Sequence, residues 1–178
     1  GFGQETMRNE DFIAQGRIPW NYRAAGPATM PGDAELGYPR VCSHRGFNTI
    51  APENTMPAFG ASVALGAVEI EMDIWPTRDH KLIVCHDRSV DRTSDGHGMI
   101  SELTWDEISR MNIGAKYAPE FNGLRFPLFE DTLRAFSRQA IINLHIKSAG
   151  KDQAYNPDDF ACILDLLRRY DMQEHVYI

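Results

Sequence analysis

The stretch Val68-Glu69-Ile70-Glu71-Met72-Asp73-Ile74-Trp75 decides the fold, because apolar and acidic side chains alternate along it without a break. A period of two predicts a β-strand with one apolar face and, on the other, carboxylates spaced roughly 7 Å apart. Such a row is unfavourable unless water, a cation or basic side chains lie over it. A bound metal ion would satisfy the row, and the alternative is the solvated outer face of an edge strand.

The composition is ordinary for one globular domain: 178 residues, of which 43% are hydrophobic and 24% charged. A net charge of −7 and the lack of a Lys/Arg run argue against a nucleic-acid surface. No transmembrane segment or signal peptide is visible. A periplasmic or secreted location is favoured if Gly1 replaces a removed signal peptide, and a cytoplasmic one otherwise. Cys42, Cys85 and Cys162 all lie in apolar settings and are expected to be buried.

Strands and helices are expected to alternate along most of the chain. Parallel-type strands should begin near Val41, Val68, Ile141 and His175. Helices should cover residues 55–66, 104–111, 129–138 and 157–170, with a further short helix around Asp11 to Gln15. This order is typical of an α/β protein with a parallel sheet.

The segment after Trp75 is expected to form an antiparallel hairpin. The break before residues 81–87 is too short for a parallel crossover, so this apolar run should pair with the acidic strand. A turn centred on residues 78–79 places Glu71 opposite His86, with an imidazole beside the carboxylates. A bulged turn would shift that register by one residue.

Several short motifs occur in one order and at close spacing. They are His44-Arg45-Gly46, Ala51-Pro52-Glu53-Asn54-Thr55, Glu71-Met72-Asp73, Thr77-Arg78-Asp79, His86-Asp87, and Arg92-Thr93 with Gly96 and Gly98. Together they resemble the glycerophosphodiester phosphodiesterase family, and Pro127-Leu128 and the strand from Asn143 to Lys147 fit its next segments. Each motif alone would be weak, but the resemblance runs from about Val41 to Ile178.

That family is similar in fold to the phosphatidylinositol-specific phospholipases C. The resemblance therefore implies a TIM (β/α)8 barrel with its active site at the C-terminal ends of the strands. Only four parallel strands are visible, so residues 41–178 are expected to form about the first half of the barrel domain, with its C-terminal part absent. A second chain or a second copy would then complete the barrel, and residues 1–40 would form an N-terminal arm.

The resemblance also implies metal-dependent hydrolysis of glycerophosphodiesters to sn-glycerol 3-phosphate and an alcohol. The implied roles are as follows: His44 and His86 as general acid and base, Arg45 and Lys147 as phosphate ligands, Glu71 and Asp73 as ligands of one divalent cation, and Glu53 and Asn54 as secondary site residues. Phosphodiester cleavage needs neutralised phosphoryl charge and a proton for the leaving alkoxide, which these groups supply. The attacking group, water or a substrate hydroxyl, stays open.

One position departs from the family pattern, since His145 stands where the family usually has a glutamate as third metal ligand. The cation is Mg, Ca, Mn or Zn, and imidazole suits Mn and Zn better than Mg and Ca. Two other functions stay open: a phospholipase acting on lipid-linked phosphodiesters, and a catalytically weakened phosphate-binding or scaffold protein.

Structural roles compete with these functional ones. Arg45 could pair only with Glu53, and Lys147 could only neutralise the carboxylate row. Arg92 either binds substrate or orders the loop after the second histidine. Glu69 matches no motif and is expected to fill the barrel or the surface.

Overall fold

The computed structural model describes residues 30–148 and 155–178, and a five-stranded sheet forms its centre. Four strands run parallel in the order β1 (Cys42–Ser43), β2 (Glu69–Pro76), β4 (Ile141–Ile146) and β5 (Val176–Tyr177). All four match expected strands. β3 (Leu82–Val84) pairs antiparallel with β2. The short helix expected around Asp11 to Gln15 lies outside the described residues, as does most of the expected arm.

The expected helices also form. They are α2 (Met56–Ala64), α3 (Trp105–Ile108), α4 (Phe129–Phe136) and α5 (Pro157–Arg169), with 3-10 turns η1 (Asp33–Glu35), η2 (Ile100–Glu102) and η3 (Pro119–Phe121). Thr55 caps α2, and Thr104 with Glu107 forms the capping box that opens α3. The helix α3 is shorter than expected because the Met111 N–H bonds to the Ile108 carbonyl, which tightens the chain into a turn.

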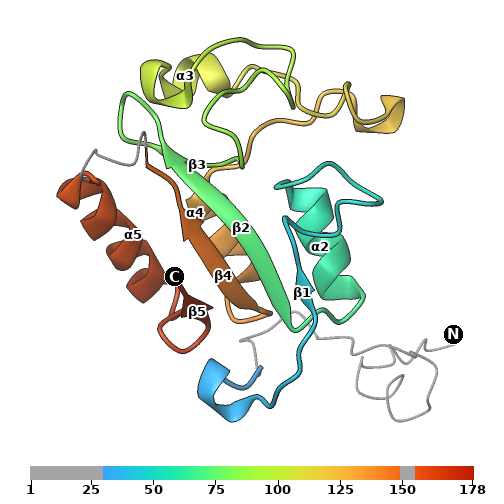
Figure 1. The fold of residues 1–178 in the computed structure, drawn as a ribbon, viewed down its shortest axis with the longest axis vertical. Helices are drawn as coiled ribbons and strands as arrows, with labels where there is room; N and C mark the ends of the chain where they lie inside the picture. The colour runs from blue at the N-terminus through green and yellow to red at the C-terminus, as the bar shows by residue number, and fades with distance from the viewer. Residues whose placement is uncertain (1–29, 149–154) are drawn as a thin grey trace, which may run out of the picture.

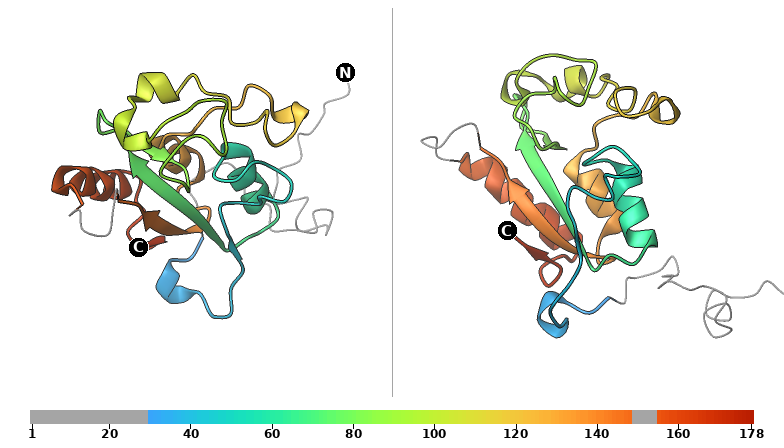
Figure 2. Two further views of the ribbon diagram at one scale, coloured as in Figure 1. Left: turned by 45° about the horizontal axis from the view of Figure 1, so that its top comes forward. Right: turned by 45° about the vertical axis from the view of Figure 1, so that its right-hand side comes forward.

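The even-numbered side chains of β2 face the helices and form the main core. Ile70, Met72 and Ile74 pack with Ile142 and Leu144 of β4 against Phe59, Leu133, Ile163 and Leu167 of the three long helices. Figure 2 shows α2 and α4 standing against the sheet in its right-hand view. The predicted alternation is therefore confirmed, and it directs the carboxylates of β2 to the opposite face.

The interpretation of the acidic row as a solvated edge is wrong. β2 is flanked by β1 and β4, and Glu69, Glu71 and Asp73 are only 5%, 2% and 0% exposed. Glu69 does not fill the surface, because Arg40 Nε lies 2.8 Å from its Oε1 and the Tyr177 hydroxyl donates to its Oε2. The row consequently lies on the face that a barrel of this type turns to its interior.

The predicted hairpin register is wrong by one residue. Ile74 pairs with Val84 and Trp75 with Ile83, because the turn holds three residues instead of two. The Thr77 N–H donates to the Lys81 carbonyl, and His80 adopts a left-handed conformation (φ 59°). A three-residue hairpin with its last loop residue in that region is a common alternative to the two-residue turn.

The long segment between β3 and α4 has a small core of its own. Trp75, Ile83 and Cys85 pack against side chains of this segment, namely Val90, Ile100, Ile108, Ile113 and Phe126. Figure 1 shows the segment, coloured yellow-green to yellow, beyond the end of the sheet toward which β2 points; residues 30–40 lie at the other end. Cys85 is buried as expected, whereas the expectation is wrong for Cys42 and Cys162, which are exposed.

Candidate functional site

Two buried carboxylates of β2 and one imidazole near the C-terminal end of β4 meet where these two strands lie side by side. The parallel register sets Glu71 beside Asn143 and Asp73 beside His145. His145 Nδ1 lies 3.0 Å from Glu71 Oε1 and 3.6 Å from Asp73 Oδ1. One ligand atom from each of the three residues lies within 4.8 Å of the other two. The three candidate metal ligands inferred from the sequence therefore converge.

The electrostatics of this group fit a divalent cation. Glu71 Oε1 and Asp73 Oδ1 are buried, and their described partners are ion-pair contacts with His145 and Lys147 rather than hydrogen bonds. Burial raises the pKa of Glu71, and the neighbouring charge of Asp73 raises it further. Ligand atoms bound at about 2.0–2.4 Å to one ion lie about 3–5 Å apart, as these three do. Two anionic oxygens and one imidazole nitrogen could thus hold a metal ion here.

Two cationic side chains flank the carboxylates. Lys147 Nζ lies 2.8 Å from Asp73 Oδ1, directly after the end of β4. Arg45 Nε lies 3.9 Å from Asp73 Oδ2, while its backbone N–H donates to Glu71 Oε2 at 2.8 Å. Arg45 Nη1 also donates to Glu53 Oε1 at 3.2 Å. Both structural roles considered from the sequence therefore occur: Arg45 pairs with Glu53, and Lys147 neutralises a carboxylate of the row. Both cationic side chains nevertheless lie beside the candidate metal ligands.

The turn after β1 is tightly determined. Arg45 has φ 57° and Gly46 has φ 78°, both in the left-handed region. A Cβ on Gly46 would lie 2.8 Å from the Cβ of Ala58, so only glycine lets the turn approach α2 this closely. The turn directs the Arg45 N–H at Glu71. Strained backbone conformations of this kind are concentrated at functional sites.

The two candidate acid–base histidines follow the two strands, β1 and β3, that pair with the same edge of β2. His44 follows β1, with 64% of its side chain exposed and Nε2 4.0 Å from Glu71 Oε2. His86 follows β3, where the Cys85 N–H bonds to the Asp73 carbonyl and the Trp75 indole N–H donates to the His86 carbonyl. The main chain of the strand pair thus places the backbone of His86 next to that of Asp73 although the predicted register is wrong, and the His86 ring contacts Asp87.

Glu53 and Asn54, the secondary candidates, contact the site from the loop after β1. Asn54 is 3% exposed, and its Nδ2 donates to Asp73 Oδ2 at 2.9 Å. Glu53 accepts hydrogen bonds from Arg92 and Arg45, and the Arg92 bond, the larger cause, lowers the pKa of Glu53.

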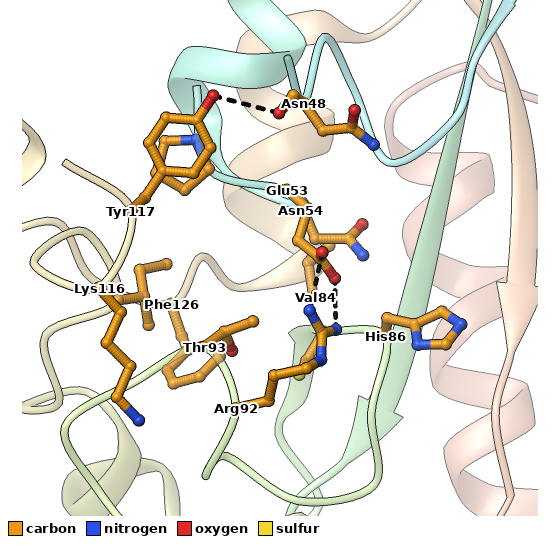
Figure 3. Close-up of a pocket in the computed structure, with 13 residues that line it drawn as sticks. Asn48, Glu53, Asn54, Val84, His86, Arg92, Thr93, Lys116, Tyr117 and Phe126 are labelled. Atoms are coloured by element: carbon orange, nitrogen blue, oxygen red, sulfur yellow. Dashed lines mark hydrogen bonds and ion pairs between the residues drawn. The ribbon is translucent and has the colours of Figure 1, made fainter. Parts of the chain in front are cut away.

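A pocket of about 370 Å³ lies between this loop and the long segment after β3. Val84, Cys85, Ile113 and Phe126 form its apolar part, and Glu53, Arg92, Lys116 and His86 are among the polar residues that line it. Figure 3 shows His86 and Asn54 on one side of the pocket and Lys116, Tyr117 and Phe126 on the other.

The sequence model of the glycerophosphoryl diester phosphodiesterase family matches residues 44–170. The chain belongs to this family. It is 33% identical over 139 residues to a glycerophosphodiester phosphodiesterase of Caldanaerobacter subterraneus, covering 78% of this chain and 56% of that protein.

Solved structures give the same result. The crystal structure of the glycerophosphodiester phosphodiesterase from Agrobacterium tumefaciens matches with a TM-score of 0.70 at 29% identity, covering 78% of this chain and 56% of that one. A phosphodiesterase of Oleispira antarctica, solved in complex with the product sn-glycerol-3-phosphate, matches with a TM-score of 0.67 at 25% identity, covering 74% and 53%. The fold is the α/β TIM-barrel type of this family, and the chain spans about half the length of these relatives. Within the described residues, no helix is long and apolar enough to cross a membrane.

The sequence did not assign a role to Asp87, and it left Arg92 open between substrate binding and loop ordering. Arg92 donates hydrogen bonds to both Asp87 and Glu53. Asp87 is also bonded to His86, and these contacts, led by that of Arg92, lower its pKa to about 2. The available signal was position alone, since Asp87 directly follows the histidine of its motif.

Proposed function

We propose that this protein hydrolyses glycerophosphodiesters to sn-glycerol 3-phosphate and an alcohol with the help of one divalent cation. The observation that carries the proposal is the convergence of Glu71, Asp73 and His145 within 4.8 Å beside two cationic side chains. Phosphodiester cleavage needs this combination, because negative charge builds up on the phosphoryl oxygens and on the leaving oxygen.

Glu71, Asp73 and His145 would hold the cation, which when bound supplies positive charge to the phosphoryl group. Two carboxylates and an imidazole make a softer donor set than three carboxylates. We therefore propose Mn²⁺ or Zn²⁺ ahead of Mg²⁺ or Ca²⁺.

Arg45 and Lys147 would hold the phosphate from the side of the sheet where both now face Asp73. Arg45 is suited to two phosphate oxygens through its planar fork, whereas Lys147 contributes a point charge. Both side chains extend from residues that follow the ends of strands, so binding a phosphate requires only local side-chain movement.

His44 and His86 would carry the protons. One accepts the proton of the attacking hydroxyl, from water or from the substrate, as the new P–O bond forms. The other donates a proton to the leaving alkoxide as the old P–O bond breaks, which releases the alcohol. Water either attacks the diester directly or hydrolyses the cyclic phosphate that forms when a substrate hydroxyl attacks first. By either route, the diester and one water give sn-glycerol 3-phosphate and the alcohol.

The substrate class is tested by comparing glycerophosphocholine with lysophosphatidylcholine, which carries the same head group on a lipid. We expect purified protein to release sn-glycerol 3-phosphate from the first and to be much slower on the second. Preference for the lysolipid would favour the phospholipase alternative. Binding of phosphate without turnover of either compound would favour the weakened phosphate-binding alternative.

A further inference from the structure

A continuous set of charged contacts joins His86 to the loop after β1. His86 Nδ1 lies 2.7 Å from Asp87 Oδ1. Arg92 Nε donates to Asp87 Oδ2 at 2.6 Å and Nη2 donates to Oδ1 at 3.1 Å. The same guanidinium donates to Glu53 through Nη1 at 3.0 Å and Nη2 at 2.7 Å. Arg92 thus grips two carboxylates, each through two hydrogen bonds.

The other end of this set reaches the phosphate side of the site. Glu53 Oε1 also accepts from Arg45 Nη1 at 3.2 Å, and the Arg45 backbone N–H bonds to Glu71. Arg92 therefore stands between the proposed proton carrier and the proposed phosphate ligand. Figure 3 shows its guanidinium directed at Glu53, with the His86 ring turned away from the pocket.

The donor count argues against two-point binding of a substrate phosphate by Arg92, because only one of its N–H donors is left over. A guanidinium has five N–H donors, and the four hydrogen bonds to Asp87 and Glu53 use four of them. Binding a phosphate there would break a pair of charge-assisted bonds whose geometry is already satisfied. The side chain is about half exposed, so these pairs add little to stability, and what they determine is geometry.

The geometry has a specific consequence for the imidazole. A carboxylate can only accept at His86 Nδ1, so Asp87 favours the tautomer with the proton on Nδ1 and leaves Nε2 free to accept one. Carboxylates that contact a functional histidine fix its ring orientation in the same way in other proteins. Asp87 is in turn held by Arg92, since both of its oxygens accept from that guanidinium.

We propose that Arg92 is a positioning residue that, through Asp87, fixes the orientation and tautomer of His86 and, through Glu53, ties this histidine to the Arg45 side of the site. This inference rests on the proposed function for its kinetic consequence but not for its structural one. Glu53 and Asp87 are the two carboxylates through which Arg92 acts.

The test compares Arg92→Ala with a matched control, Arg110→Ala, in the whole protein. Arg110 is also an exposed arginine of the segment after β3, but among the described residues its ion-pair partner is Asp106, four residues earlier in the chain. The ring ¹⁵N shifts of His86, recorded by NMR without substrate, report its tautomer independently of any activity. We expect the Nδ1–H form to dominate in the wild type and in Arg110→Ala, and a mixture of tautomers in Arg92→Ala.

Kinetics give the second readout. Arg92→Ala should lower kcat about 10–100-fold, the usual effect of losing a group that orients a functional histidine, while Mn²⁺ affinity measured by calorimetry stays within twofold. Arg92→Lys should lie between the two, since an ammonium ion cannot grip both carboxylates in this way. It also replaces Arg92→Ala if that variant does not fold.

The outcomes separate the two proposals. If Arg92→Ala alters the His86 shifts but the wild type shows no phosphodiesterase activity, the positioning role is supported and the proposed function is refuted. Unaltered shifts in Arg92→Ala, with kcat equal to that of Arg110→Ala, would overturn the positioning role and leave the proposed function standing.

Discussion

Asn54 and Asp73 exchange two hydrogen bonds in the interior of the site: Asn54 Nδ2 donates to Asp73 Oδ2 at 2.9 Å, and the Asp73 N–H donates to Asn54 Oδ1 at 3.3 Å. Both side chains are buried. With one carboxylate oxygen held by the amide, the other is left facing His145 and Lys147. The loop after β1 thus orients a carboxylate of β2.

The first prediction concerns this amide. Asn54→Gly should lower the free energy of unfolding by about 1–3 kcal/mol, because a buried carboxylate loses a hydrogen bond. Glycine is the right replacement because Asn54 has φ 54°, which alanine would adopt only under strain. Mn²⁺ affinity should fall about tenfold or more. Urea unfolding measures the change in stability and calorimetry the change in Mn²⁺ affinity, with Asn122→Gly at an exposed position as the control. Equal effects in the two variants would contradict the role of the Asn54 amide in orienting Asp73.

A second prediction concerns the cation ligands. Mn²⁺ should raise the Tm of the wild type, and Glu71→Gln or Asp73→Asn should abolish that shift because each removes an anionic ligand. Glu69→Gln is the matched control, since Glu69 lies on the same strand and face but pairs with Arg40. A metal-induced shift that survives in Asp73→Asn would place the ion elsewhere.

His145 makes a separate prediction about metal choice. His145→Glu replaces a nitrogen donor by an oxygen donor and should move the preference from Mn²⁺ or Zn²⁺ toward Mg²⁺ or Ca²⁺. The measurement is the relative affinity for the four ions in metal-stripped protein. If His145→Ala left all four affinities unchanged, His145 would not be a ligand.

Part of this site could be predicted from local periodicity, which placed the carboxylates on one face of β2 and His145 and Lys147 on one face of β4. Their roles came from the resemblance to the family, and the observed register between β2 and β4 sets them side by side. Burial of the acidic row was not predictable from β2 alone, since it depends on β1 and β4 arriving on both sides. The hairpin register failed at His80, whose left-handed backbone is not signalled by a glycine.

The Arg92 contacts show a different limit of sequence analysis. Glu53 and Arg92 are 39 residues apart, and no period or spacing relates them. Only the packing of the segment after β3 over Trp75 brings them together.

A fourth prediction concerns the pH dependence of stability. The pKa of Asp87 is lowered to about 2, chiefly by hydrogen bonds from Arg92. A carboxyl with a lowered folded-state pKa stabilises the fold above its unfolded pKa, about 3.9, and loses that contribution as the pH falls toward 2. The unfolding free energies of the wild type and Asp87→Asn should therefore differ most above pH 5, by up to about 1 kcal/mol for such partly exposed groups, and converge only at about pH 2 and below. A difference that grows in acid, measured by urea unfolding, would reverse the sign and contradict this account.

A fifth prediction separates close packing from backbone strain in the turn after β1. Gly46 and Gly66 both have positive φ, 78° and 81°. A Cβ added at Gly46 would lie 2.8 Å from the Cβ of Ala58, whereas a Cβ added at Gly66 would have no other atom within 4 Å. Gly66→Ala should therefore cost about 1 kcal/mol, and Gly46→Ala about 1–3 kcal/mol more. Equal losses in thermal or urea unfolding would show that the approach to α2 is not tight.

The central claim is tested most directly by ³¹P NMR of glycerophosphocholine incubated with metal-stripped protein that is then reloaded with Mn²⁺. The account predicts that the sn-glycerol 3-phosphate resonance grows only after reloading, and that His44→Ala and His86→Ala each slow its growth by about 10²–10⁴-fold. Failure to form this product with Mn²⁺, Zn²⁺, Mg²⁺ or Ca²⁺, or rates in both histidine variants equal to the wild type, would contradict it.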